Sequence, residues 1–253
     1  MRSRLYNGQV SRADVADPAT LAFLVIPLFL AVGFLAAVWI SWRRTGAASR
    51  APQATAVALV SLGIWMTVTW FAAASGALQR WDATPPPFAI MVLTVVLLGL
   101  RIGLGTVGRR MAESIPLWIL VAVQAFRFPL ELAMHRMYER GVMPVQMSYS
   151  GLNYDILTGI SALLVATLVY RGVAGRRLVR LWNVLGLLLL INVVTVAILA
   201  TPRIRYFGDH NLNVWVTYPP FVWLPAVMVL AAFAGHLVIF RALATRPGDG
   251  GPR

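Results

Sequence analysis

The polar residues of one apolar segment are the strongest candidates for chemistry in this chain. Residues 115–138 are long enough to span a bilayer, yet they include Gln124, Arg127, Glu131 and His135. At about 100° per residue, spacings of three and four place these side chains on one face of a helix. A charge inside a membrane costs about 3 kcal/mol or more on insertion scales, and such residues pair or mark a functional path. We therefore expect this face to contact protein or water and to bind a ligand or a proton.

Pro129 lies within the same segment and affects its geometry. Proline has no N–H to donate to the carbonyl of Ala125, four residues earlier. The sequence therefore predicts a kink near Pro129 with an unpaired carbonyl at Ala125.

Polar residues of other apolar segments can be matched to this helix by depth, since each helical residue rises about 1.5 Å. On this basis Asp155 lies level with His135 toward the outside, and Asn192 lies level with Arg127 and Glu131. A third, inner group pairs two further side chains. The predicted ligand- or proton-binding set is Arg127, Glu131, His135, Asp155, Asn183, Asn192 and His236. No catalytic residue and no metal ligand is assigned.

The inner group consists of Asn183 and His236, and its relation to the middle group is open. Asn183 and Asn192 are nine residues apart, which puts them on opposite faces of one helix. The polar residues therefore form either one continuous column or two separate features.

Each position also has a structural interpretation. Arg127 and Glu131, at i and i+4, fit an internal salt bridge. Asp155 opens a predicted helix and fits a cap. The asparagines fit interhelical hydrogen bonding, and His135 fits a solvated residue near the interface.

The composition is that of an integral membrane protein. Hydrophobic residues make up 59% of the chain, and the mean hydropathy is +0.73. The net charge of +13 comes from arginine, because the chain has no lysine. Without lysine a retinal Schiff base is excluded, and without cysteine so are disulfides, iron–sulfur clusters and thiolate metal sites. The arginines lie mostly in short loops between apolar segments, which is typical of membrane topology rather than of nucleic-acid binding.

The hydropathy pattern predicts an all-α membrane bundle of about seven transmembrane helices. We expect a polar N-terminal arm at 1–19, the transmembrane domain at 20–243 and a disordered tail at 244–253. The longest loop, 201–220, is rich in aromatic residues and fits a lid or an interfacial segment. The predicted spans are 21–42, 53–77, 88–107, 115–138, 154–170, 181–200 and 221–240.

The loops that share a side with the C-terminus hold most of the arginines. They are 43–52, 108–114, 171–180 and the tail. By the positive-inside rule the C-terminus is cytoplasmic and the N-terminus is outside.

Several short motifs mark the second half of the chain, mainly 127–241. They are RFPLE (127–131), MSYSGLNYDILTGI (147–160), LWN (181–183), Asn192, NVWVTYPPFVWLP (213–225) and GHLVIFR (235–241). With these motifs the chain resembles an uncharacterised family of bacterial multi-pass membrane proteins, and the first three spans share only general hydropathy with it. The resemblance implies a fold and a set of polar positions, and it implies no activity. We expect the protein to lie in the bacterial inner membrane.

Several functions fit these residues. In the favoured one, the polar face lines a cavity that binds or passes a small molecule, an ion or a proton. A redox protein would ligate haem or face a quinone with His135 and His236, but their depths place them in opposite halves. A metal-dependent hydrolase would need three ligands in one layer, and only His135, Glu131 and Asp155 come near that. A structural or assembly subunit is the remaining alternative, and the absence of HExxH or GxSxG motifs favours a non-enzymatic role.

Overall fold

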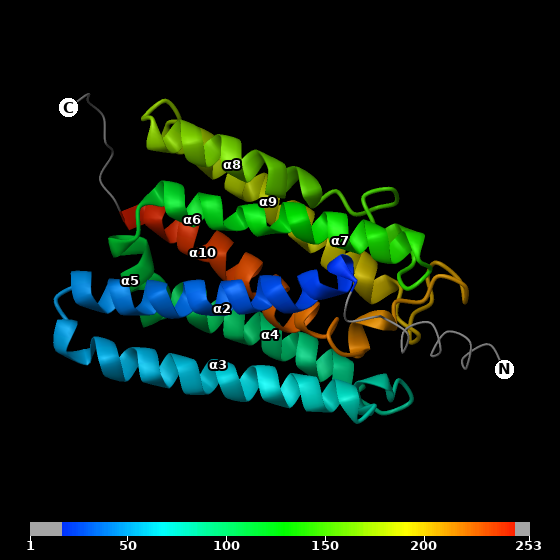
Figure 1. The fold of residues 1–253 in the computed structure, drawn as a ribbon. Coiled ribbons are helices and arrows are strands. Elements are labelled where there is room, and N and C mark those ends of the chain that lie inside the picture. Colours follow the sequence, from blue (N-terminus) through cyan, green and yellow to red (C-terminus); the bar gives the residue numbers. More distant parts are fainter. Residues whose placement is uncertain (1–16, 246–253) are drawn as a thin grey trace.

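The computed structural model describes residues 17–245, which form a bundle of roughly antiparallel helices (Figure 1). The described residues contain no strand, which confirms the all-α prediction. The helices are α2 (Pro18–Arg44), α3 (Ala51–Ala74), α4 (Pro87–Leu104), α5 (Thr106–Ser114), α6 (Leu117–Val123), α7 (Arg127–Glu139), α8 (Ile156–Tyr170), α9 (Arg176–Leu199) and α10 (Leu230–Thr245).

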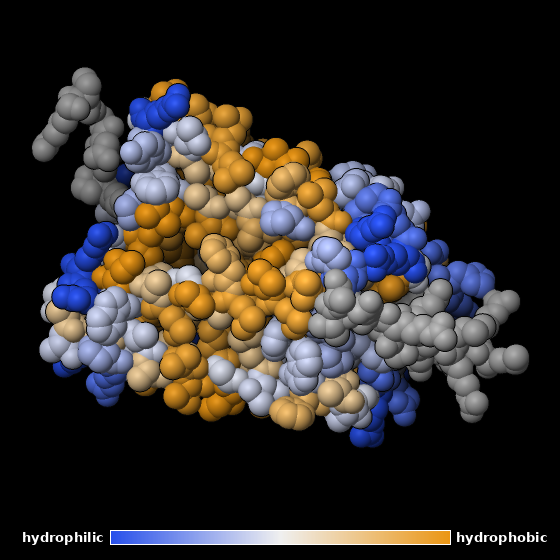
Figure 2. Space-filling view, in the orientation of Figure 1, coloured by the Kyte–Doolittle hydropathy of each residue, from blue (hydrophilic) through white to orange (hydrophobic). Residues whose placement is uncertain are grey.

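Within the described residues, 6 helical segments are long and apolar enough to cross a membrane. The predicted fifth span, α8, is apolar but has only 15 residues. Hydrophobic residues gather in a broad middle band of the surface, and hydrophilic residues gather at both ends of the bundle (Figure 2). The long apolar segments are Pro18–Arg44, Ala48–Ala74, Pro87–Leu104, Leu117–Glu139, Arg176–Leu199 and Leu224–Thr245.

The helix ends agree with the predicted alternation of the chain across the bundle. α2 begins at the end of the bundle where α7 finishes, and α10 finishes at the opposite end, near α5 (Figure 1). Arginines join the elements at this second end. Arg110 Nη1 donates to the carbonyl of Thr45 over 3.2 Å, and Arg241 Nη1 donates to that of Gly105 over 3.0 Å.

Several predicted boundaries differ from the structure: α3 ends at Ala74 rather than near residue 77, α9 begins at Arg176 rather than near residue 181, and α10 ends at Thr245 rather than near residue 240. The third span ends at Leu104 rather than near residue 107, and 108–114, expected as a loop, belongs to α5. The segment is helical because its apolar side chains, Met111 and Ala112, are buried on one face while Arg109 is exposed on another.

The first predicted span also starts earlier than expected, at Pro18. Asp17 caps this helix by accepting a hydrogen bond from the Thr20 N–H over 3.3 Å. The polar arm therefore ends before residue 17. Residues 1–16 and 246–253, which include most of the predicted disordered tail, lie outside the described residues.

The helical winding changes just before Pro129, where the sequence predicts a kink. Between α6 and α7 the chain makes a 3-10 turn, Gln124–Phe126, and Pro129 follows in the first turn of α7. Proline is tolerated there because the first N–H groups of a helix have no intrahelical acceptor. The carbonyl of Ala125 is paired, contrary to our expectation, because it accepts from the N–H of Arg127.

The bundle is held by close helix contacts at small residues and by an aromatic cluster. A Cβ placed on Gly159 of α8 would lie 2.3 Å from the backbone nitrogen of Phe128, so α8 and α7 touch here.

Part of the loop 201–220, predicted as a lid or an interfacial segment, belongs to the core. Trp215 is fully buried, with its ring centroid 5.6 Å from that of Phe23 and 5.1 Å from that of Phe221. Only the first part of loop 201–220, around Tyr206, is exposed.

The approach to α10 is also irregular. Residues Leu224–Val229 are wound as a π-helix and continue directly into α10. Such turns are rare and occur often at functional sites.

Candidate functional site

Arg127 lies at the start of α7, near the middle of the Leu117–Glu139 segment, and is 1% exposed. Its Nη1 donates to Asp155 Oδ1 over 3.0 Å and more weakly to the carbonyl of Gly186 over 3.4 Å. Its Nε and Nη2 have no hydrogen-bond partner among residues 17–245. The guanidinium is thus half satisfied, which is costly for a buried charged group.

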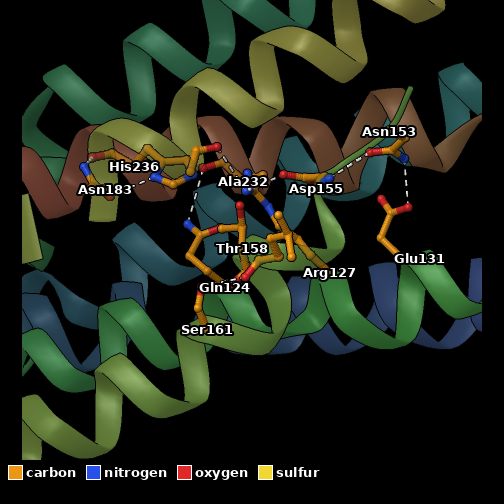
Figure 3. A network of polar contacts seen from close by, with 12 residues as sticks. Gln124, Arg127, Glu131, Asn153, Asp155, Thr158, Ser161, Asn183, Ala232 and His236 are labelled. Carbon is orange, nitrogen blue, oxygen red and sulfur yellow. Dashed lines mark hydrogen bonds and ion pairs between the residues drawn. The ribbon is translucent and has the colours of Figure 1, made fainter. Parts of the chain in front are cut away.

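The ion pair continues into a hydrogen-bonded cluster (Figure 3). Asn153 accepts from the Asp155 N–H over 3.0 Å and donates from its own Nδ2 to Glu131 Oε2 over 2.8 Å. The same Nδ2 donates to the carbonyl of Met147 over 2.9 Å. We call Arg127, Asp155, Asn153 and Glu131 the Arg127 cluster; it joins α7 to the loop before α8.

The pairing within this cluster differs from the sequence prediction. Arg127 forms its ion pair with Asp155 and not with Glu131 at i+4. The close α7–α8 contact at Gly159, one turn after Asp155, brings that carboxylate to the guanidinium from another helix. Asp155 occupies the cap position of α8 but makes no side-chain cap hydrogen bond, so the capping interpretation is wrong.

His135 is not part of the cluster, and the predicted His135–Asp155 pair is wrong. The Nδ1 of His135 lies 2.8 Å from Ser148 Oγ, and its ring stacks on that of Tyr149 with centroids 4.2 Å apart. Its Nε2 lies 3.7 Å from Glu139 Oε1. His135 therefore belongs to the outer rim of the bundle, two turns beyond Arg127 on a half-exposed surface.

The predicted pairing of Asn183 with His236 is confirmed. Both residues are fully buried, and His236 Nδ1 lies 2.7 Å from Asn183 Oδ1. Asn183 Nδ2 also donates to the backbone carbonyl of His236 over 3.0 Å. The other ring nitrogen of His236, Nε2, has no partner among the described residues. This inner pair joins α9 to α10.

Asn192 does not join the middle group, contrary to its predicted depth match. Its Nδ2 donates to the carbonyl of Leu152 over 2.7 Å, in the loop before α8. Asn183, in contrast, faces α10. The two asparagines therefore use opposite faces of α9, as their spacing indicated.

Two buried residues were absent from the predicted set. Asn153 bridges Asp155 and Glu131, and its signal was its position two residues before Asp155 in a polar stretch. Gln124 belongs to the polar face of its helix, is 1% exposed, and donates to the carbonyl of Ala232 over 3.3 Å.

A cavity of about 330 Å³ lies beside the Arg127 cluster. Arg127, Glu131 and Asp155 form its charged wall. The remaining lining is mostly apolar. Met147, Asn213 and Val216 contribute from connecting segments, and most of the rest comes from four helical segments. They contribute Phe88, Val92, Val95 and Val96 of α4, Leu130 and Met134 of α7, Leu190, Ile191, Val194 and Ile198 of α9, and Met228, Ala232 and Phe233 around the start of α10.

The cavity reaches the outer surface of the bundle between α4 and α9. Thr195 is exposed there, and its hydroxyl donates to the carbonyl of Ile191 over 2.8 Å within α9. The other exposed lining residues are Val96 at 40%, Ile191 at 52% and Ile198 at 39%. Since these side chains are aliphatic and lie on membrane-length helices, the opening faces the region that lipid would occupy.

The described residues contain no group of three His, Cys, Asp or Glu side chains that could hold a metal ion. His135 and His236 make separate sets of contacts, at the rim and in the interior of the bundle. In the Arg127 cluster, the Asp155 carboxylate pairs with Arg127 and the Glu131 carboxylate accepts a hydrogen bond from Asn153.

Comparison with known proteins places this site in a family without an assigned function. No curated protein and no solved structure matches the chain. Residues 86–244 match a domain of unknown function, DUF8737. The match includes α4, although the first three spans showed only general hydropathy, and it contains every residue of the Arg127 cluster and of the cavity wall. The chain therefore belongs to the family defined by this domain of unknown function.

Proposed function

We propose that this chain is a multi-pass membrane protein that binds a lipid-soluble small molecule with an oxygen-bearing head group in the cavity beside Arg127. The observation that carries the proposal is the combination, in one cavity, of an apolar lining and a buried guanidinium with two unpartnered nitrogens, Nε and Nη2. Ligand sites are typically apolar with a few polar groups that fix orientation.

The charges of the cluster indicate what kind of head group would bind. Asp155 already neutralises Arg127, so the remaining N–H donors suit a neutral acceptor such as a carbonyl better than a second anion. Glu131 also lines the cavity, and only its Oε2 accepts a hydrogen bond within the described residues. Its other oxygen is available to a hydroxyl. A ligand with a carbonyl and a hydroxyl, as in a monoacylglycerol head group, would satisfy both residues, and a quinone carbonyl would satisfy Arg127 alone.

The side opening supports entry from the bilayer rather than from water. A ligand that slid between α4 and α9 would keep its apolar part against Val96 and Ile191 while its head reached Arg127. In this proposal the helices cross the bacterial inner membrane with the arginine-rich end, including the C-terminus of α10, in the cytoplasm.

Binding is favoured over passage of an ion or a proton across the membrane. Within the described residues, no hydrogen bond connects the Arg127 cluster to the Asn183–His236 pair. Two separate polar groups support a binding site better than a continuous polar path.

Thermal unfolding of the detergent-purified protein tests the proposal, since a ligand that binds the native state raises the melting temperature. We would compare monoolein and a short-chain ubiquinone with dodecane, which lacks a polar head. At least one of the oxygen-bearing compounds should stabilise the protein, and dodecane should not.

A cavity-filling variant provides the control for location. Val194→Trp places a large ring in the cavity, whereas Val184→Trp makes the same change on an exposed part of α9 outside it. The stabilisation should disappear in Val194→Trp and remain in Val184→Trp. Equal stabilisation of the two variants, or none by either oxygen-bearing compound in the unmodified protein, would refute the proposal.

A further inference from the structure

A second hollow lies at the arginine-rich end of the bundle, away from the Arg127 cluster. It has a volume of about 530 Å³ and runs between α3 and α4. α3 packs on α2, while α4 packs on α10 and α5, so the two helices leave a groove between them. Phe34, Val38 and Trp42 of α2 form its floor. We call this the α3–α4 groove.

The mouth of this groove is basic. Arg50 lies just before α3 and Arg101 lies in the last turn of α4, and both line the groove together with Gln53. No acidic side chain lines it. Neither arginine forms an ion pair within residues 17–245.

The guanidinium of Arg101 lies at the C-terminal end of α4. A Cβ built on Gly105 would lie 2.8 Å from Arg101 Nη1, so the guanidinium extends past Leu104, the last residue of α4. This is how an arginine near a helix end reaches the interfacial region from an apolar helix. Trp42 lies at the same level, with the Arg110 guanidinium 4.9 Å from its ring centroid, as expected of an interfacial tryptophan.

The body of the groove is apolar and long. From Gln53 to Trp65 it follows α3 for about 18 Å, at about 1.5 Å per residue. Its walls along this length include Val57 and Leu62 of α3 and Leu98 of α4. The groove thus combines an apolar channel at membrane depth with a basic mouth at the interface.

We propose that the α3–α4 groove binds an anionic phospholipid, with the phosphate between Arg50 and Arg101 and an acyl chain along α3 toward Trp65. Basic pockets between transmembrane helices on the cytoplasmic side recognise anionic head groups, and guanidinium groups match phosphate geometry. The site lies largely on α2 and α3, outside the matched family domain, and does not depend on the function proposed for the Arg127 cavity.

Native mass spectrometry of the detergent-purified protein, titrated with phosphatidylglycerol or phosphatidylcholine of identical acyl chains, tests this site. We expect one phosphatidylglycerol to bind more tightly than phosphatidylcholine. The double variant Arg50→Gln/Arg101→Gln should weaken phosphatidylglycerol binding about tenfold, because each basic residue at a membrane surface adds to anionic lipid attraction.

The matched control removes two positive charges from the same end of the bundle. Arg177→Gln/Arg180→Gln changes two exposed arginines of α9 that lie outside the groove. This variant should retain phosphatidylglycerol binding within about twofold, because the proposed head-group contacts remain. Equal losses in both double variants would overturn the proposal, as would equal affinity for the two lipids.

Two further measurements separate the groove from a simple anion site. Val57→Trp fills the groove without changing charge, and Val60→Trp makes the same change on an exposed part of α3 outside it. Only Val57→Trp should reduce lipid binding. If inorganic phosphate at millimolar concentration displaced the lipid, or if both tryptophan variants bound it normally, the acyl chain would not occupy the groove and the proposal would fail.

Discussion

Arg127 and Asp155 form a 3.0 Å ion pair between two helices whose backbones approach closely at Gly159. Both partners are nearly inaccessible, with side-chain exposures of 1% and 7%. A charge at this depth is stable only with a partner, and here the partner comes from the next helix rather than from the same one. The pair therefore orders the loop before α8 as well as neutralising Arg127.

The first prediction concerns this pair. Arg127→Leu and Asp155→Leu should each destabilise the protein by about 3–5 kcal/mol, because each leaves a buried charge alone, and the double variant should recover most of that loss. Melting temperatures in detergent measure the cycle. Leucine at both Arg205 and Asp209, an exposed pair in the loop 201–220, should change little. Strictly additive losses at Arg127 and Asp155 would contradict the pairing.

The second prediction concerns the bridge to Glu131. Asn153→Leu removes the donor to Glu131 Oε2 and to the carbonyl of Met147, so it should lower stability by about 1–3 kcal/mol. Glu131→Gln keeps an oxygen that can accept from Asn153 and should cost less. Chemical or thermal unfolding of the two variants shows which one loses more stability. A larger loss for Glu131→Gln would show that the negative charge, and not the hydrogen bond, stabilises the cluster.

The third prediction concerns the helix contact itself. Gly159→Ala places a methyl group 2.3 Å from the Phe128 backbone nitrogen, so α8 must move away from α7 and the ion pair must lengthen. Gly63→Ala, in α3, meets no atom within 4 Å and should be neutral or slightly stabilising, since alanine favours helix over glycine by up to about 1 kcal/mol. Only Gly159→Ala should lower the melting temperature. Similar behaviour of the two variants would refute the close contact.

The fourth prediction concerns topology. α10 ends at the arginine-rich end of the bundle, and the loop 201–220 lies at the other end, so reporters fused after Arg253 and at Gly208 should report opposite sides of the membrane. The C-terminal fusion should report the cytoplasm. Two reporters on the same side would show that the segment Leu224–Thr245 does not cross the membrane.

The sequence predicted the helices well because their signal is local. Long apolar runs and arginine-rich loops predicted the spans. Pro129 predicted an irregularity in the central helix, and a 3-10 turn lies between α6 and α7. The boundary of α4 was missed because hydropathy does not distinguish a turn at Gly105 from a continuing helix, and an amphipathic face placed α5 where a loop was expected.

Pairing in the site was harder to predict because it depends on contacts between distant segments. Depth along the helices correctly joined Asn183 to His236, where both residues lie inside regular helices. It failed for His135 and Asp155, because the loop before α8 folds back and carries Asp155 to Arg127. The role of Asn153 depends on the same loop geometry. The cavity could not be predicted because its lining comes from several helices and from the segments that connect them.

The π-helical segment Leu224–Val229 sets the rotational phase of everything that follows it in α10. A π turn holds more residues than an α turn, so if the same six residues were wound as an ordinary α-helix, the rest of the helix would be rotated by about 100°, the angle of one helical residue. That rotation would carry His236 away from Asn183 and Phe233 away from Gly99. The winding of this short segment therefore determines which face of α10 meets the interior.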